Sequence, residues 1–278
     1  MAGNFVQLHN HTHYSLLDGA SKVPDLVKRV KELGMPAVGI TDHGNMHGAY
    51  ELWRAAVDSG VKPIIGIEAY VTPETARQDK TRVSWDTNWT PVPGHARNPD
   101  DVSGGGLITH LTMWAENDEG LVNLIKASSV ANLEGRVMRY PRMDKEVLST
   151  YSKGVIASSG CPSGIIQTRL RLGQFDEALR AAGEFQDIFG KDNFYIELMD
   201  HGLSIESKVT GDLLTIAKKL GAPLLATNDS HYVMEADKDA QDAMLCINSG
   251  ATLDDPNRFK FEGSGYYIKS AEEMRELF

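Results

Sequence analysis

Two histidines near the N-terminus have the spacing of a metal-binding pair. His9 and His11 follow residues 5–8, where apolar and polar residues alternate as they do in a half-buried strand. Side chains alternate across a strand, so both imidazoles point the same way and can share one divalent cation. Asp18 lies beyond a short turn and could return to the same site. For an isolated pair of histidines, a solvated loop is the simpler interpretation. Residues later in the chain must therefore decide between a loop and a metal site.

Further metal-competent side chains lie at or just after the ends of later predicted strands. Together with the first three, the candidate ligands are His9, His11, Asp18, His43, Glu68, His110, Cys161, Asp229 and His231. Singly, each has another explanation: Asp18 as a turn residue, Glu68 as a buried ion-pair partner, Cys161 as a small apolar filler. Their joint placement at strand ends is not explained in this way, and it favours a shared metal site.

The types of these side chains indicate the chemistry. Nine ligands are too many for one tetrahedral zinc ion, but they suit a cluster of two or three divalent cations. The mixture of imidazoles, carboxylates and one thiolate favours zinc, manganese or iron over calcium. Such a cluster lowers the pKa of a bound water and stabilises the attacking and leaving oxygens of an in-line displacement. The residues therefore predict phosphoester hydrolysis.

Alternating strands and helices are expected to position these ligands. Strands are predicted at residues 5–8, 37–41, 63–67, 107–112, 154–158, 194–198 and 224–227. Apolar residues at helical spacing predict helices at residues 24–33, 48–59, 175–189, 209–220 and 236–247, with another following an expected cap at Asn117. Repeated strand–helix alternation predicts parallel strands with helices outside.

The placement of the ligands decides between two such folds. In an open doubly wound sheet, ligands at successive strand ends would spread along a line. In a closed barrel, the C-terminal ends of the strands surround a single site. The predicted fold class is therefore α/β, a seven-stranded TIM-like barrel with its metal site at the C-terminal ends of the strands.

Composition narrows the class of protein. The chain has 278 residues, 41% of them hydrophobic, so it can bury a large core, and no apolar stretch approaches the roughly 20 residues of a membrane helix. Only two cysteines are present, Cys161 and Cys246, which argues against a disulfide framework and fits a reducing cytoplasm. The formal charge of −10 argues against a free-standing nucleic-acid binder, although bound metals can reverse charge locally.

One long segment breaks the alternation. Residues 72–106 are rich in proline, glycine and charge and have no clear period, so we expect a surface insertion. Trp85 and Trp89 lie within it, and packing against the domain is the favoured use for them over contact with a partner.

Four stretches carry a family resemblance. They are HNHTHYSLLDG at residues 9–19, ITDHGN at 40–45, GVKPIIGIE at 60–68 and ATNDSHY at 226–232. With these stretches the sequence resembles the polymerase and histidinol phosphatase (PHP) family. It is most similar to the N-terminal PHP domains of bacterial replicative DNA polymerase III alpha subunits, the C-family DNA polymerases.

The resemblance implies a distorted (β/α)7 TIM-like barrel that binds up to three metals. In the family pattern, one metal is held by His9, His11, Glu68 and Asp229, a second by Glu68, His110 and Cys161, and a third by Asp18, His43 and His231. The same pattern makes His11, Asp18 and Glu68 the catalytic residues. Two to three divalent metals are then expected, with zinc favoured and manganese or iron as alternatives.

The implied activity is a metal-dependent 3′–5′ exonuclease that proofreads DNA within a DNA-directed DNA polymerase. Its implied partners are a DNA 3′ end, the remaining polymerase domains and other replisome subunits, without a membrane. Residues 1–278 would form the PHP domain, and 251–278 would begin the connection to the polymerase domains. Two alternatives stay open: an inert metal-stabilised scaffold and a small-molecule phosphoesterase. The intact ligand set favours the exonuclease.

Overall fold

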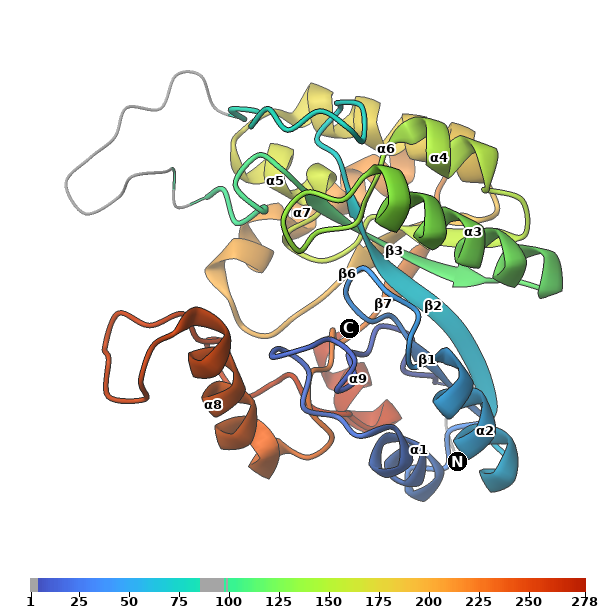
Figure 1. The fold of residues 1–278 in the computed structure, drawn as a ribbon, viewed down its shortest axis with the longest axis vertical. Coiled ribbons are helices and arrows are strands. Elements are labelled where there is room, and N and C mark those ends of the chain that lie inside the picture. The colour runs from blue at the N-terminus through green and yellow to red at the C-terminus, as the bar shows by residue number, and fades with distance from the viewer. Residues whose placement is uncertain (1–4, 86–97, 99) are drawn as a thin grey trace. The chain divides into compact units, whose positions relative to one another are not determined.

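A computed structural model describes residues 5–85, 98 and 100–278. The chain divides into two compact units. Unit 1 comprises Met1–Ile67, Met199–Leu203 and Ala226–Phe278, and unit 2 comprises Glu68–Leu198 and Ser204–Leu225. Figure 1 labels most of the helices and strands.

Unit 1 is built mainly from the N-terminal quarter of the chain and from its C-terminal segment. Its elements are α1 (Val23–Glu32), β1 (Ala37–Ile40), α2 (Ala49–Ser59), the first part of β2 (Lys62–Val71), a 3₁₀ turn (Glu235–Asp237), α8 (Lys238–Ser249) and α9 (Ala271–Leu277). Strands β1 and β2 are parallel. The N-terminal segment bonds on both sides: Gly39 N donates to Gln7 O at 2.9 Å, and Ser230 N donates to His9 O at 3.1 Å. It therefore lies between β1 and the segment that follows residue 226.

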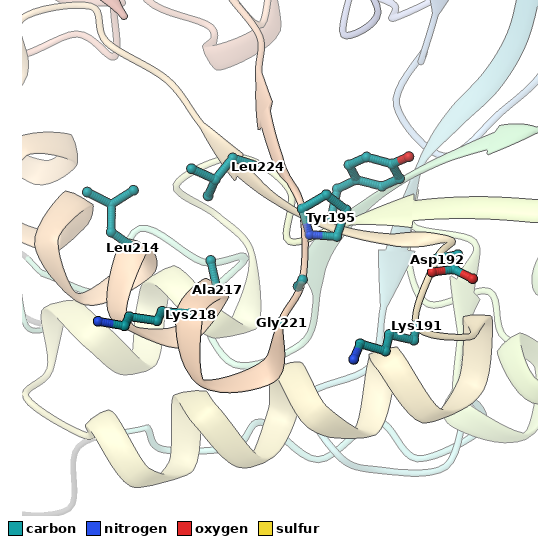
Figure 2. A pocket seen from close by; sticks show the side chains of 10 residues that line it. Lys191, Asp192, Tyr195, Leu214, Ala217, Lys218, Gly221 and Leu224 are labelled. Carbon is teal, nitrogen blue, oxygen red and sulfur yellow. The ribbon is translucent and has the colours of Figure 1, made fainter.

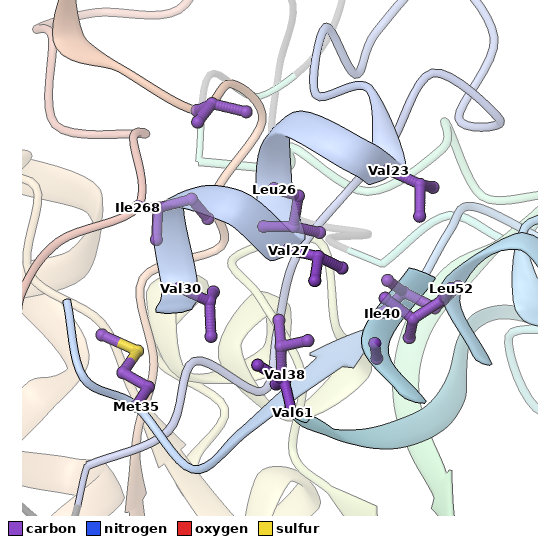
Figure 3. Close-up of a cluster of buried hydrophobic side chains, with 12 residues drawn as sticks. Val23, Leu26, Val27, Val30, Met35, Val38, Ile40, Leu52, Val61 and Ile268 are labelled. Carbon is purple, nitrogen blue, oxygen red and sulfur yellow. The ribbon is translucent and has the colours of Figure 1, made fainter. Parts of the chain in front are cut away.

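The core of unit 1 forms where α1 packs on β1 and α2. The helix buries Val23, Leu26, Val27 and Val30 on one face, at the spacing that the sequence predicts (Figure 3). Pro24 occupies its first turn, and Gly34, with φ of 68°, follows its end. Burial of each such side chain contributes about 1.5–3 kcal/mol. This packing holds β1, and with it the ligand-bearing turn that follows β1.

Unit 2 contains the greater part of the sheet. Its elements are the rest of β2, β3 (Thr109–Ala115), α3 (Asp118–Glu134), β4 (Arg142–Met143), α4 (Lys145–Thr150), β5 (Val155–Ser158), α5 (Ile165–Arg171), α6 (Phe175–Phe189), β6 (Phe194–Leu198), α7 (Ser204–Leu220) and most of β7 (Leu224–Ala226). The strand order is β1-β2-β3-β5-β6-β7, and β4 pairs with β2. Strands β5 and β6 are parallel, whereas β3 runs antiparallel to β5.

The α/β fold class is confirmed, but three details of the prediction are wrong. The sheet is not wholly parallel, because β3 is reversed. Residues 5–8 form no strand. The N-terminal segment is joined to its neighbours by isolated backbone hydrogen bonds and by a single β-bridge at Asn10. Strand β2 continues past Glu68 to Val71 instead of ending before it. In the described part of the chain, no helix has the length and apolar character needed to cross a membrane.

A buried arginine holds the start of segment 72–106. Arg142 is fully buried and donates to the backbone carbonyls of Arg77 at 2.7 Å and Asp79 at 2.6 Å. Trp85 is also buried, and its indole N–H donates to Ser103 Oγ at 3.0 Å. Packing of Trp85 is thus confirmed, whereas Trp89 lies outside the described residues. That the whole segment is a surface insertion stays a prediction.

Candidate metal centre

Unit 1 brings six of the candidate ligands into one buried region. They are His9, His11, Asp18, His43, Asp229 and His231. The first group within it joins the N-terminal segment to the segment after β7. Oδ1 of Asp229 lies 3.3 Å from Nε2 of His9 and 3.1 Å from Nε2 of His11. Ligand atoms of these three residues all lie within 4.8 Å of one another, a spacing that suits one cation.

A second group in unit 1 adds the turn after β1. Oδ2 of Asp18 lies 2.8 Å from Nε2 of His43 and 3.8 Å from Nε2 of His231. The His11 ring stands between the two groups, with its centroid 4.0 Å from that of His43 and 4.3 Å from that of His231. His11 is therefore the residue that links the two candidate positions of unit 1.

The segment that carries Asp229 and His231 is held in an unusual backbone conformation. Asp229 has φ of 43°, a left-handed value that is uncommon for residues other than glycine and is often found at functional sites. Neighbouring Asn228 anchors the segment by donating from Nδ2 to the carbonyls of Gly265 at 2.7 Å and Tyr267 at 2.8 Å. Nδ1 of His231 lies 2.8 Å from the carbonyl of Asp229. A carbonyl only accepts, so Nδ1 carries the proton and Nε2 keeps the lone pair that a metal needs.

The electrostatics of unit 1 favour the metal-binding protonation states. Burial, followed by repulsion from His43 and His231, lowers the pKa of His11 to about 3, so its imidazole is neutral at pH 7. Burial alone would raise the pKa of Asp18, but His231 and His43 lower it to about 2. Burial would also raise the pKa of Asp229, but His9 and His231 hold it far below its usual range. Neutral imidazoles and ionised carboxylates are the forms that bind cations.

Two buried atoms test whether these residues fit a metal. Oδ1 of Asp18 and Nε2 of His231 are buried and make no hydrogen bond to the described residues. Buried polar atoms nearly always have a partner, and these two are a carboxylate oxygen and an imidazole nitrogen, both common metal ligands. The group therefore fits divalent cations that accept nitrogen and oxygen together, such as zinc, manganese or iron. Calcium, which prefers oxygen ligands alone, fits poorly.

In unit 2, His110 contacts each of the other two remaining candidates, Glu68 and Cys161. Nδ1 of His110 lies 3.2 Å from Oε2 of Glu68 and 3.4 Å from Sγ of Cys161. Glu68 is fully buried and lies within β2, and Cys161 follows the end of β5. His110 is the second residue of β3, so its predicted place at a C-terminal strand end is wrong. It still reaches the others because β3 is antiparallel to β5, which puts the start of β3 beside the end of β5.

Each ligand thus has close partners within its own unit. The pattern that the resemblance implies for the first metal joins Glu68 of unit 2 to three residues of unit 1. That assignment stays a prediction, as do the identities of the metals. The groups within each unit are supported by the distances between their own ligand atoms.

Sequence analysis missed two polar residues beside the ligands, Ser15 and Asp42. Asp42 does not cap the helix that follows it, because α2 begins after Gly48 without a side-chain cap. Instead the buried Asp42 carboxylate accepts from Thr12 N and from Ser15 Oγ, each at 2.7 Å. Burial raises the pKa of Asp42, and these hydrogen bonds oppose the rise. The partners lie 27 and 30 positions away, so only the i, i+4 spacing of His11 and Ser15 was a local signal.

A separate hollow in unit 2 has no connection with these ligands. It lies beside the C-terminal end of α7 and is lined by charged and apolar side chains, among them Lys191, Asp192, Tyr195, Lys218 and Leu224 (Figure 2). None of the nine candidate ligands is among its lining residues. We assign it no function.

Comparison with known proteins gives one family match and several close relatives. The sequence profile of the PHP domain matches residues 7–201. The chain is 53% identical over 275 residues to the DNA polymerase III subunit alpha of Mycobacterium leprae, covering 99% of this chain and 23% of that protein. It is 54% identical over 274 residues to that of Saccharopolyspora erythraea, with the same coverage of 99% and 23%. The chain thus spans about a quarter of the length of these relatives.

Among solved structures the similarity is weaker. An amidohydrolase from Chromobacterium violaceum, solved with bound sulfate and no metal, gives a TM-score of 0.47 at 14% identity, covering 83% of this chain and 88% of that one. A two-domain protein from Bacteroides vulgatus, described as "containing predicted PHP-like metal-dependent phosphoesterase", gives 0.45 at 13% identity, covering 84% of this chain and 54% of that one.

Proposed function

The chain belongs to the PHP domain family, and from this premise we propose that it is a metal-dependent phosphodiesterase that removes nucleotides from the 3′ end of DNA. In this proposal it proofreads as one domain of a replicative DNA polymerase. The observation that carries the proposal is the buried convergence of His9, His11 and Asp229 around a common point, in a chain whose close relatives are DNA polymerase subunits. The same ligands would also hold the metals of an inert scaffold, so hydrolysis of DNA is the property that separates the two functions.

The described residues define the roles within this proposal. Bound divalent cations would polarise a phosphodiester and lower the pKa of an attacking water. We assign His9, His11 and Asp229 to hold one cation, and Asp18 with His43 and His231 to hold another. Asp18 is assigned as a ligand because its Oδ2 lies 2.8 Å from Nε2 of His43 and 3.8 Å from Nε2 of His231. We assign Glu68, His110 and Cys161 to the remaining ligand group, in unit 2, on the contacts that His110 makes with the other two.

A row of aromatic rings beside His231 supports a nucleic-acid substrate. The Phe261 ring meets the His231 ring edge-on at 4.7 Å between centroids, and the Phe259 ring follows at 6.0 Å from Phe261. Phe259 is 62% exposed, and the exposed Lys260 lies between the two phenylalanines in sequence. Aromatic faces stack on bases, and lysine attracts the phosphate backbone. A small phosphate ester without a base would gain nothing from such a row.

One variant measures this contribution directly. Phe259→Ala is expected to lower kcat/KM on single-stranded DNA by about 5- to 160-fold, because stacking on an aromatic side chain is worth about 1–3 kcal/mol per base. On substrates with an abasic 3′-terminal residue, the same variant should lower kcat/KM much less. Leu253→Ala is the matched control, since Leu253 is 54% exposed in the same segment and lies outside the row. Equal losses on the normal and abasic substrates would remove the stacking role.

The proposal as a whole is tested by metal analysis together with digestion of DNA. Protein made in metal-replete medium is expected to contain about two to three divalent cations per chain, as the number of ligands requires. The same preparation should shorten end-labelled, 3′-mismatched DNA from its 3′ end with zinc or manganese. Metal without hydrolysis would favour the scaffold. Hydrolysis of histidinol phosphate but not of DNA would favour the small-molecule phosphoesterase. Fewer than one cation in a fully ordered chain would contradict the cluster itself.

A further inference from the structure

The surroundings of Ser15 carry an inference about how His11 is prepared for a metal. Ser15 Oγ lies 3.0 Å from Nδ1 of His11, 2.7 Å from Oδ1 of Asp42 and 3.1 Å from the backbone N of His43. Ser15 and Asp42 are each 1% exposed, and His11 is fully buried. All of these residues belong to unit 1. Water is therefore excluded from the hydroxyl, and its protein partners must account for its hydrogen bonds.

Counting protons assigns the direction of each bond. A serine hydroxyl has one proton to donate and can accept through its lone pairs. The Asp42 carboxylate can only accept, so Ser15 donates its proton there. The backbone N–H of His43 can only donate, so Ser15 accepts from it. With its proton already committed, Ser15 can meet His11 only as an acceptor, which places a proton on Nδ1 of His11.

The second hydroxyl bonded to Asp42 follows the same pattern. Thr12 Oγ1 lies 2.9 Å from Oδ2 of Asp42 and accepts from the backbone N of Tyr14 at 3.2 Å. Thr12 N also donates to Asp42 Oδ1, at 2.7 Å. Each hydroxyl thus accepts one backbone N–H and donates to Asp42, and three donors converge on this carboxyl group. That is the surrounding of an ionised carboxylate, which keeps the proton of Ser15 directed away from His11.

We propose that Ser15, oriented by Asp42, is a positioning residue that holds His11 in the tautomer with Nδ1 protonated and Nε2 free to bind a metal. This inference rests on His11 acting as a metal ligand, as proposed above, but not on the identity of the substrate. No role for Ser15 or Asp42 follows from the ligand set itself.

The geometry also shows why such a device is needed. Nε2 of His11 lies 3.1 Å from Oδ1 of Asp229. Without a metal, that carboxylate attracts a proton to Nε2, and the resulting N–H would occupy the lone pair that the metal requires. An acceptor at Nδ1 opposes this, because a neutral imidazole carries only one N–H. In His231 the same task falls to a backbone carbonyl, 2.8 Å from Nδ1, which no side-chain substitution removes.

Nitrogen NMR of the metal-free chain reads the tautomer of each histidine separately. In the wild-type chain, His11 and His231 are both expected to carry their proton on Nδ1. In Ser15→Ala, His11 should shift to the Nε2-protonated form, while His231 stays unchanged as an internal reference. Affinity for zinc, measured by competition with a chelator, should fall about 10- to 100-fold, as is typical when the partner of a histidine ligand is lost.

Two further variants separate positioning from a general loss of structure. Ser15→Thr keeps the hydroxyl and should retain the wild-type tautomer and most of the zinc affinity. Ser21→Ala removes another buried hydroxyl of unit 1, one that makes no hydrogen bond to the described residues, and should change neither property. If Ser15→Ala does not fold, the wild-type spectrum still decides, because an Nε2 proton on His11 there overturns the inference.

An unchanged Nδ1 proton on His11 in folded Ser15→Ala would overturn it equally. Neither measurement uses DNA or turnover. A chain that shows the expected tautomers and affinities but does not degrade DNA would therefore contradict only the proposed exonuclease.

Discussion

Replacing His11 by alanine is expected to reduce excision of a mismatched 3′ nucleotide by at least about a hundredfold, since losing even the outer partner of a metal ligand costs 10- to 100-fold. In a polymerase subunit that carries this domain, nucleotide incorporation should remain largely intact. The reason for the large effect is the position of His11 between both ligand groups of unit 1. Its Nε2 lies 3.1 Å from Oδ1 of Asp229, and its ring lies 4.0 Å from that of His43.

The control for this variant is another histidine of unit 1. His47 is exposed and belongs to none of the groups that could hold a metal. His47→Ala should therefore keep both activities. Both activities are measured on the same end-labelled, mismatched primer, with and without nucleotides. Undiminished excision by His11→Ala would eliminate the proposed site. Equal loss of excision and incorporation would support the scaffold, because only a structural role affects the two together.

The elements that were predictable carry strong local signals. Four apolar residues at helical spacing and a following Gly34 predict a helix at 24–33, and α1 spans Val23–Glu32. The cap expected at Asn117 is confirmed, since its side chain accepts from Gly120 N at 3.1 Å. These features depend on residues a few positions apart, so they can be recognised without knowledge of the fold.

The features that were missed depend on distant partners. The sequence of residues 109–115 does not indicate that β3 runs antiparallel to β5, because strand direction follows from the connections between strands and from their packing. The bonds of Asp42 to Thr12 and Ser15 join residues 27 to 30 positions apart, so no pattern of neighbouring residues indicates them. The composition of unit 1 from three separate segments is likewise invisible in the sequence.

Candidate ligands were easier to predict than the strands that hold them. His110 was selected as the end of a strand, yet it lies near the beginning of one. The selection still placed it beside Glu68 and Cys161, because the chemical type of a side chain and its nearness to a strand terminus are preserved when the strand is reversed. Residue chemistry is therefore a stronger guide to this site than strand direction.

The role of Cys161 leads to the second large effect. Cys161 is buried, and the chain approaches it through Gly160, whose φ of 77° suits a tight turn. Its Sγ lies 3.4 Å from Nδ1 of His110. Arg171 holds this loop by donating to the carbonyl of Pro162 at 2.7 Å. Burial lowers the pKa of Arg171 to about 10, although Cys161 opposes the fall, and the guanidinium stays charged at pH 7.

Cys161→Ser is therefore expected to remove about one metal position per chain, because a serine hydroxyl does not replace the thiolate that selects softer cations. Hydrolysis should fall sharply with zinc and recover in part with manganese, which accepts oxygen ligands. The fold should persist, since the groups of unit 1 do not involve Cys161. Metal content, melting temperature and hydrolysis are measured on the same preparation.

Cys246→Ser is the matched control, because Cys246 is the other cysteine of the chain, is equally buried at 5% exposure, lies in α8 and is not one of the candidate ligands. It should lower the melting temperature without changing the metal content. If Cys161→Ser gives that same result, Cys161 is an apolar filler of the core. The thiolate would then no longer bias the site toward zinc, and the remaining imidazoles and carboxylates would accommodate manganese or iron equally well.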